Sequence, residues 1–320
     1  YPYASSYIVI YLIGTLCVML SLGLNPYINC QGFARTGMLT VALGAAANIV
    51  LDPIFIFALH LGVRGAAIAT VLSQFLSAAW VVKFLTSKKA ELKLDFRGFR
   101  PDCQCIQRIT VLGIASFVMS FTDTLVQVAC NATLRNFGGD LYISVMTVLN
   151  SVRQIAQTPV LAIADGASTA ISYNYGAGLY KRTRDAIRFM TQIAIGYTML
   201  VWMLVSLFPA LFIRIFNQDA ELVAAAVPAL HIYFFGFVMM AFQYAGQSTF
   251  RALGRAKYAV FFSLLRKAFI VVPLTLLLPY CWNLGVSGVF AAEPVSNCIG
   301  GLACYFTMRH VVMPELKMEN

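Results

Sequence analysis

Charged side chains are scarce in this chain of 320 residues: only 11% are Asp, Glu, Lys or Arg, while 60% are hydrophobic. A soluble domain carries about 25% charged residues, so the composition excludes a soluble globular protein. The mean hydropathy of +0.76 agrees with an all-α integral membrane protein. A membrane barrel is excluded as well, because its strands would alternate apolar and polar residues and these segments do not.

Histidine is also scarce, with three residues, and none of the eight cysteines forms a CxxC pair. Cys103 and Cys105 have no second pair or neighbouring histidine, so we predict no metal site. The P-loop, GxSxG and HExxH motifs are absent. No polar segment is long enough for a nucleotide-binding domain, which excludes an ATP-driven pump. We therefore expect neither an enzyme, even an intramembrane one, nor an organic cofactor.

The net charge of +10 is scattered over short loops between apolar runs, which argues against a nucleic-acid partner. Nine apolar runs are long enough to cross a bilayer. One alternate set of the loops between them holds 17 Lys and Arg residues and the other set holds 3. This bias predicts that the first set and the C-terminus are cytoplasmic. The predicted spans are 8–30, 36–59, 64–86, 109–134, 141–165, 188–216, 224–249, 257–281 and 285–309.

The longest polar stretch, 87–108, is basic and is predicted to be a cytoplasmic linker between two lobes. Residues 1–86 would form the C-terminal half of a first lobe, 109–310 a complete second lobe, and 311–320 a cytoplasmic tail. The chain starts at Tyr1, which the charge bias places outside, and no signal region precedes the first span. We therefore expect further spans upstream.

A duplicated unit connects the two lobes. Residues 61–74, LGVRGAAIATVLSQ, have a partner in residues 284–297, LGVSGVFAAEPVSN. The LGVRG and LGVSG turns that open the two copies fall on the outer side, each just before the last helix of its lobe, so they predict parallel repeats related by an axis along the membrane normal. The segments before the two copies also match, with Pro53 aligned to Pro273. The repeats diverge where Asp52-Pro53 becomes Val272-Pro273 and where Thr70 becomes Glu293.

Ionisable residues within spans are costly and therefore indicate a partner, a cavity or a function. Asp52 precedes a proline that frees a backbone carbonyl, so it is a candidate for binding a cation or proton unless it lies at the outer interface. Asp123, Gln127 and Asn131 form a polar stripe on one helix face, which faces a cavity or joins two helices.

Asp165 lies on a span that Pro159 and Gly166 are predicted to break. Arg153 on the same span is about 18 Å away along a helix, too far for direct pairing. Arg266 and Glu293 lie on successive spans, which are usually neighbours. They are predicted to pair, either structurally or as a coupling pair. The predicted coupling residues are Asp52, Asp123, Asp165 and Glu293, and the predicted cavity residues are Gln127, Asn131, Arg153, Tyr175, Gln243 and Arg266.

Several segments together resemble the MATE (multidrug and toxic compound extrusion) family, most closely its DinF/MepA-like branch. The likeness covers essentially the whole chain and rests on the order of its motifs. They are NIVLDPIFIFAL followed by GVRGAAIATVLSQ, the paired turns QGFARTG and RALGRAKY, and NFGGDLYISVMTVLNSVRQIAQTPVLAIADGASTAISYNYGAG, whose end contains the family's NYGA-type sequence at 174–177.

The resemblance implies a two-lobed transporter of twelve helices, of which this chain would hold helices four to twelve. Asp52 matches an acidic position in helix five of MepA-like members. Asp123 falls near the helix-seven carboxylate of Na⁺-coupled NorM-type members, but the span 224–249 lacks their helix-ten carboxylate, which puts a NorM-type sodium site in doubt. The Asp of helix one, on which proton coupling in DinF-like members centres, would lie upstream.

The implied function is secondary active multidrug efflux, in which an organic and often cationic compound leaves as H⁺ or Na⁺ enters by alternating access. A lipid-linked oligosaccharide flippase of the same superfamily is the alternative. It would favour a large basic cavity, whereas three intramembrane cations face four acids here. The expected partners are small-molecule drugs and membrane lipids, and the expected form is a monomer in the bacterial inner membrane.

Overall fold

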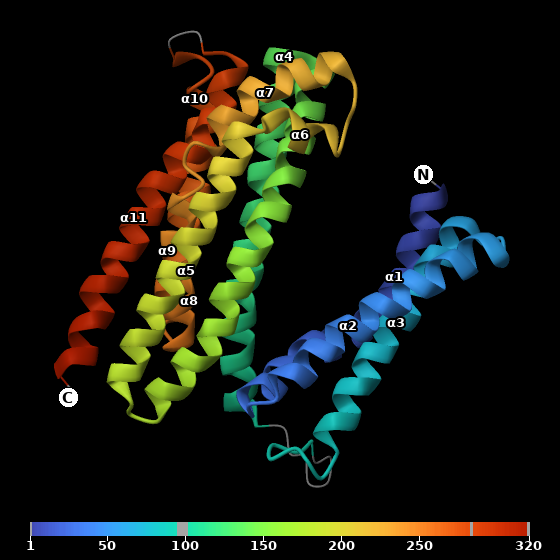
Figure 1. The fold of residues 1–320 in the computed structure, drawn as a ribbon, viewed down its shortest axis with the longest axis vertical. Helices are drawn as coiled ribbons and strands as arrows, with labels where there is room; N and C mark the ends of the chain where they lie inside the picture. Colours follow the sequence, from blue (N-terminus) through green and yellow to red (C-terminus); the bar gives the residue numbers. More distant parts are fainter. Residues whose placement is uncertain (1, 95–101, 282–283, 319–320) are drawn as a thin grey trace. The chain divides into compact units, whose positions relative to one another are not determined.

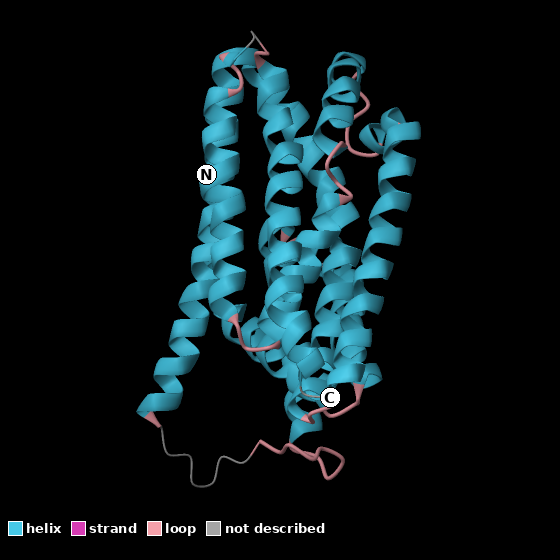
Figure 2. Cartoon of the chain, turned by 90° about the vertical axis from the view of Figure 1, so that its left-hand side faces the viewer, coloured by secondary structure: helices cyan, strands magenta, loops and turns pink. Residues whose placement is uncertain are grey.

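The computed structural model describes residues 2–94, 102–281 and 284–318, in which every regular element is a helix (Figure 1, Figure 2). The all-α fold is thus confirmed. Its contacts divide the chain into two units, Tyr1–Pro101 and Asp102–Asn320. The division falls within the stretch predicted as a linker, whose residues 95–101 lie outside the described part.

The first unit is a group of three antiparallel helical segments. Ile28, Val81 and Leu85 are fully or almost fully buried and form its core. The Ser77 hydroxyl donates to the carbonyl of Thr40 at 3.0 Å and ties the third segment to the second. The elements are α1 (Pro2–Cys30), α2 (Ala34–Pro53), the π-helix η1 (Ile54–Ala58) and α3 (Gly62–Leu85).

The second unit is a bundle with two main apolar clusters. One cluster surrounds Leu134, Leu149 and Phe234, and the other surrounds Ile187 and Phe250. The elements are α4 (Cys103–Gly176), α5 (Tyr180–Leu207), α6 (Pro209–Arg214), α7 (Ala220–Phe234), α8 (Met239–Ala252), α9 (Ala256–Leu264), the π-helix η2 (Leu265–Val271), α10 (Val272–Leu277) and α11 (Val286–Met318).

Helix α4 contains two of the predicted spans. It begins after Asp102, whose carboxylate accepts the backbone N–H of Gln104 at 3.0 Å, and this hydrogen bond lowers the pKa of Asp102. Gly139, with φ 69° and ψ −163°, is non-helical and separates the two spans. The predicted break at Pro159 and Gly166 is wrong, because the helix continues through both residues. Proline's fixed φ is compatible with a helix, so one lost hydrogen bond need not end it.

Two other predicted spans are interrupted. The span 188–216 divides into α5 and α6 at Phe208, whose φ of −126° and ψ of 50° are non-helical. Pro209 follows it, and a residue before proline is disfavoured in the helical region. The span 224–249 divides into α7 and α8, which are bent by 51°.

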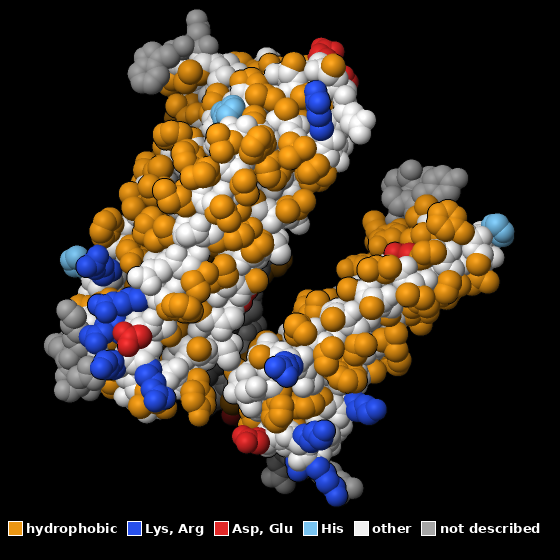
Figure 3. All heavy atoms as spheres, viewed as in Figure 1, with side chains coloured by type: hydrophobic (Ala, Val, Ile, Leu, Met, Phe, Trp, Pro, Cys, Tyr) orange, Lys and Arg blue, Asp and Glu red, His pale blue; other side chains and the backbone are white. Residues whose placement is uncertain are grey.

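The surface is that of a membrane protein. Ile13, Phe57 and Phe269 are each more than 70% exposed despite being apolar. Among the described residues, five helices are long and apolar enough to cross a bilayer, and the bent α7–α8 pair would be a sixth. The other three predicted spans lie on α4 and α11, which carry buried or cavity-facing polar residues. In Figure 3 the face of the second unit is largely hydrophobic, with most of its Lys and Arg near the end that holds the C-terminus.

The repeated turns of the two units have the same backbone geometry. Gly62 and Gly285 both have a φ of 53°, which residues with a side chain rarely adopt. Gly62 is the first residue of α3, and Gly285 directly precedes α11. A β-carbon at Gly65 would lie 2.5 Å from the carbonyl oxygen of Phe55, and one at Gly288 would lie 2.7 Å from the carbonyl carbon of Leu278. In each unit the start of the last helix therefore packs closely on the backbone before the turn.

A close backbone contact also stabilises the bend between α7 and α8. A β-carbon at Gly236 would lie 2.7 Å from both the Cα and the carbonyl oxygen of Pro294 on α11. We therefore expect Gly236→Ala to lower the free energy of unfolding by about 1–3 kcal/mol, the usual cost of overpacking. Thermal unfolding of the purified protein measures the effect.

The matched control is Gly196→Ala on α5, where a β-carbon would meet nothing within 4 Å. It should be neutral, or stabilising by up to about 1 kcal/mol through helix propensity. Equal melting temperatures for the two variants would contradict the close packing at Gly236.

Candidate functional site

A polar cavity of about 480 Å³ lies within the second unit. This volume falls in the range of small-molecule sites, about 300–1,000 Å³. Its wall is formed by side chains of α4, α7, α8, α9, η2, α10 and α11. Six of the residues predicted from the sequence line it: Asp123, Gln127, Arg153, Gln243, Arg266 and Glu293.

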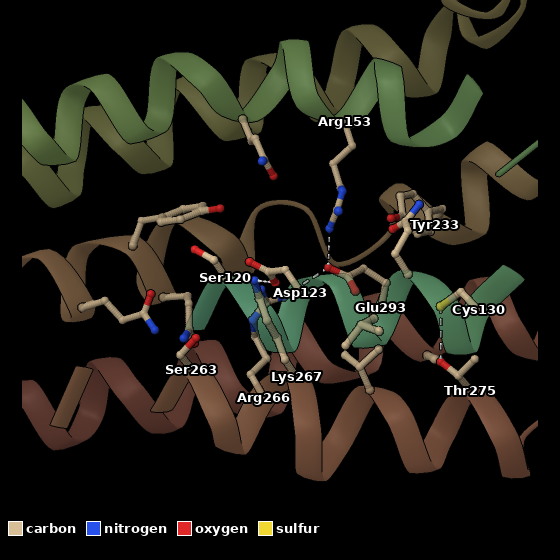
Figure 4. Close-up of a pocket in the computed structure, with 18 of the residues that line it drawn as sticks. Ser120, Asp123, Cys130, Arg153, Tyr233, Ser263, Arg266, Lys267, Thr275 and Glu293 are labelled. Carbon is tan, nitrogen blue, oxygen red and sulfur yellow. Dashed lines mark hydrogen bonds and ion pairs between the residues drawn. The ribbon is translucent and has the colours of Figure 1, made fainter. Parts of the chain in front are cut away.

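Glu293 on α11 connects two arginines from different helices. Its Oε1 accepts from Nη1 of Arg153 on α4 at 2.8 Å and from Nη1 of Arg266 on η2 at 3.1 Å. Arg266 also donates from Nη1 to Oδ1 of Asn297 at 2.7 Å. The predicted Arg266–Glu293 pair is therefore confirmed, and Arg153 is an additional partner that the sequence did not indicate. In Figure 4 Arg153 extends from its helix toward Glu293.

The carboxylate of Asp123 forms an ion pair with the ammonium of Lys267. Asp123 is on the first half of α4 and Lys267 is on η2, next to Arg266. The side chain of Asp123 is 53% exposed, so the pair opens onto the cavity. A sodium ion or a proton at Asp123 would therefore have to compete with this ammonium group.

Tyr233 on α7 extends the polar network around Arg153. Its hydroxyl donates to Oδ1 of Asn150 at 2.9 Å, and its ring centroid lies 5.7 Å from Cζ of Arg153. Such a cation–π contact contributes about 0.5–2 kcal/mol, depending on desolvation. Together these contacts fix the guanidinium at the cavity wall.

Arg266 and Lys267 are consecutive residues of the π-helix η2, and they reach carboxylates on two different helices. Arg266 pairs with Glu293 on α11 and Lys267 with Asp123 on α4. A π-helical turn widens the helix locally and rotates the side chains that follow, and such turns are frequent at functional sites. Neither this rotation nor the Lys267–Asp123 pair was predicted from the sequence.

The other predicted site residues lie outside the cavity wall. Asp52 is in the first unit, where its Oδ1 accepts from Nδ2 of Asn48 at 3.2 Å. Asp165 pairs with Arg251 at 3.3 Å in an exposed ion pair. Tyr175 packs edge-on against Tyr180 with ring centroids 5.9 Å apart. Asn131 is half-buried on α4 and does not line the cavity.

Metal binding finds no support in the described part of the chain. Within residues 2–94, 102–281 and 284–318, no group of three or more His, Cys, Asp or Glu side chains could hold a metal ion. The cavity carboxylates Asp123 and Glu293 instead face cationic side chains. The arrangement is therefore suited to exchanging charged partners, either protons or charged ligands.

Relatives with known names cover most of this chain. It is 23% identical over 305 residues to the multidrug export protein MepA of Staphylococcus haemolyticus. The aligned region covers 95% of this chain and 66% of that protein. It is 22% identical over 300 residues to MepA of Staphylococcus aureus strain MSSA476, with coverages of 93% and 65%. The chain thus spans slightly less than two thirds of the length of these relatives.

Solved structures show the same fold. A MATE family multidrug resistance transporter of the MOP superfamily, in an outward-facing conformation, matches with a TM-score of 0.90 and 22% identity. A MOP superfamily transporter from Pyrococcus furiosus gives the same two values. Each match covers 98% of this chain and 70% of the other.

The family assignment rests on a match to a family model. The MatE family model matches residues 115–277, which is just over half of the chain and includes most of the cavity wall. Members of this family are transporters rather than enzymes. The resemblance found in the sequence is therefore confirmed, and the chain belongs to the MatE (MATE) family of membrane transporters.

Proposed function

We propose that the protein is a secondary active multidrug exporter, which moves organic and often cationic compounds outward in exchange for H⁺ or Na⁺ by alternating access. The observation that carries this proposal is a cavity with ionisable residues at membrane depth, inside a family of transporters. Charged groups within membrane spans usually mark substrate or ion pathways. The MepA relatives are named multidrug export proteins, which supports the same direction of transport.

Coupling is assigned to carboxylates that can change partners. Asp123 is half exposed to the cavity while paired with Lys267, so a proton on Asp123 would release the ammonium group. Glu293 holds Arg153 and Arg266 together, so protonation of Glu293 would weaken both ion pairs and loosen the contact between α4 and η2. Asp52, bonded to Asn48 in the first unit, is a third candidate. Asp165 is a weaker candidate because its pair with Arg251 is exposed.

The proposed topology keeps residues 1–86 in a first lobe, 87–108 as linker, 109–310 as the second lobe and 311–320 as tail. The cluster of Lys and Arg near the C-terminal end of the second unit (Figure 3) supports a cytoplasmic C-terminus in the bacterial inner membrane. We expect a monomer surrounded by lipid. The relatives matched over most of the chain are named export proteins, which favours export over the flippase alternative.

Efflux by cells tests the proposal. The full-length protein should lower ethidium accumulation, and Asp52→Asn or Asp123→Asn should weaken this effect, because each removes a carboxylate that can exchange a proton or cation. The measurement is ethidium fluorescence in cells with and without the protein, at matched expression.

Asp185→Asn is the control, since Asp185 is an exposed acid at the start of α5 that lies outside the cavity. It should export like the unmodified protein. Normal efflux in both Asp52→Asn and Asp123→Asn would remove these acids from the mechanism, and no efflux by the unmodified protein would contradict the function itself.

A further inference from the structure

The cavity of the second unit carries more positive than negative charge. Its wall holds four cationic side chains but only two carboxylates, those of Asp123 and Glu293. A third carboxylate, that of Asp165, pairs with one of these cations, Arg251, from outside the wall. Even with that pair counted, one positive charge is left without a carboxylate. The four cations are Arg153, Arg251, Arg266 and Lys267.

The excess charge is located at Glu293. Lys267 has Asp123, and Arg251 has Asp165, so each of these cations has its own carboxylate. Arg153 and Arg266 share the single oxygen Oε1 of Glu293. A buried cation without a full counter-charge is costly at membrane depth. A bound anion would offset that cost.

Arg153 is the arginine of this group that a ligand can reach. Its side chain is 25% exposed, compared with 7% for Arg266. One of its terminal nitrogens is bonded to Glu293, and the cation–π contact with Tyr233 holds the guanidinium plane. Figure 4 shows Arg153 reaching into the space between α4 and Glu293. A planar guanidinium fixed in this way suits an acceptor with two oxygens.

A buried amide in the same wall has no partner. Gln243 on α8 is only 3% exposed, and neither its Nε2 nor its Oε1 has a hydrogen-bond partner within the protein. An unpaired buried polar atom costs about 1–3 kcal/mol, so a ligand oxygen that accepts from this amide would be stabilised. The amide Nε2 can donate to an anionic oxygen of a ligand.

From these observations we infer that the cavity contains a subsite for the carboxylate of an organic anion, bound by Arg153 with Gln243 as a second donor. The inference rests on the proposed exporter function and extends its substrates from organic cations to organic acids. Arg266 stays with Glu293 and Asn297 and keeps that carboxylate in place. The ligand's carboxylate therefore supplies the missing counter-charge of Arg153.

Binding of two fluorescent probes of similar size tests the subsite. We would measure fluorescence anisotropy of fluorescein, an organic anion with a carboxylate, and of ethidium, an organic cation, with the purified full-length protein. Arg153→Gln should weaken fluorescein binding roughly tenfold, the loss expected for one charge-assisted contact. Gln243→Leu should weaken it by a smaller factor. Asp123→Asn should tighten it, because the carboxylate no longer neutralises Lys267.

Two controls distinguish a loss of the subsite from misfolding of the variant and from a change in the net charge of the protein. Arg182→Gln removes one exposed cation of α5 outside the cavity and should leave fluorescein binding unchanged. A far-UV circular dichroism spectrum like that of the unmodified protein shows that Arg153→Gln is folded. If Arg153→Gln does not fold, the tightening in Asp123→Asn alone decides.

The inference is overturned if the unmodified protein binds ethidium but not fluorescein, a result that leaves the proposed export of cations intact. Equal fluorescein affinity in the unmodified protein and Arg153→Gln would overturn it as well, as would unchanged or weaker fluorescein binding in Asp123→Asn. If the unmodified protein neither exports nor binds ethidium, that result would instead count against the proposed function.

Discussion

Replacing Glu293 by glutamine should lower the free energy of unfolding by about 3–5 kcal/mol, the cost of leaving a buried charge without its partner. Glu293 is the shared acceptor of Arg153 and Arg266, and its side chain is only 11% exposed. Without the carboxylate, two guanidinium groups would face each other across the cavity wall. The melting temperature should fall by roughly 10 °C, as measured by thermal unfolding in detergent.

Charge balance, rather than shape, should account for this loss. In the double variant Glu293→Gln/Arg266→Gln the net charge of the group returns to that of the unmodified protein, so part of the stability should return. Arg266→Gln alone should be milder, because Glu293 keeps Arg153 as a partner.

An exposed ion pair supplies the matched control. Asp165→Asn removes an acid from the pair with Arg251, whose side chains are 62% and 47% exposed. Such pairs contribute about 0–1 kcal/mol, so the melting temperature should change little. A Glu293→Gln variant as stable as Asp165→Asn would show that the three-residue group does not hold α4, η2 and α11 together.

Disrupting the Asp123–Lys267 pair should have the second large effect, this time on export. Asp123→Asn should reduce ethidium efflux to near the level of cells without the protein, because the carboxylate that exchanges the coupling ion is gone. Lys267→Gln should also impair efflux, since Asp123 would lose the partner with which it forms an ion pair.

The double variant Asp123→Asn/Lys267→Gln separates the two roles that the sequence left open for Asp123. If the pair only joins α4 to η2, neutralising both residues restores stability and efflux together. If Asp123 exchanges the coupling ion, stability returns while efflux does not, and we expect this second result. Parallel measurement of melting temperature and ethidium efflux distinguishes the outcomes, and restored efflux would make Asp123 a structural residue.

Features set by the local sequence were largely predictable. The nine apolar runs all fall on helices, because span length and hydropathy are properties of consecutive residues. The repeated LGVRG and LGVSG turns have matching backbone geometry at Gly62 and Gly285, since glycine tolerates a positive φ. The Arg266–Glu293 pair followed from the tendency of successive spans to pack together.

Features set by packing between distant helices were not predictable. Arg153 and Glu293 are 140 positions apart, and helical periodicity indicates which face a residue is on but not which helix lies opposite. Asp123 and Lys267 likewise lie on helices far apart in the sequence, and the sequence gives no clear signal for the π-helical turn that holds Lys267. At Pro159 the prediction from the local sequence was wrong. A proline usually indicates a break, but α4 continues as a helix through this residue.

The most direct test of ion-coupled export is transport by the purified full-length protein in proteoliposomes without ATP. With a proton or a sodium gradient imposed separately, ethidium should accumulate against its concentration gradient under at least one of them, and Asp123→Asn should abolish this accumulation. Asp185→Asn should behave like the unmodified protein. The absence of uphill ethidium movement under both gradients, or full activity in Asp123→Asn, would contradict the proposal that a cavity carboxylate couples export to cation entry.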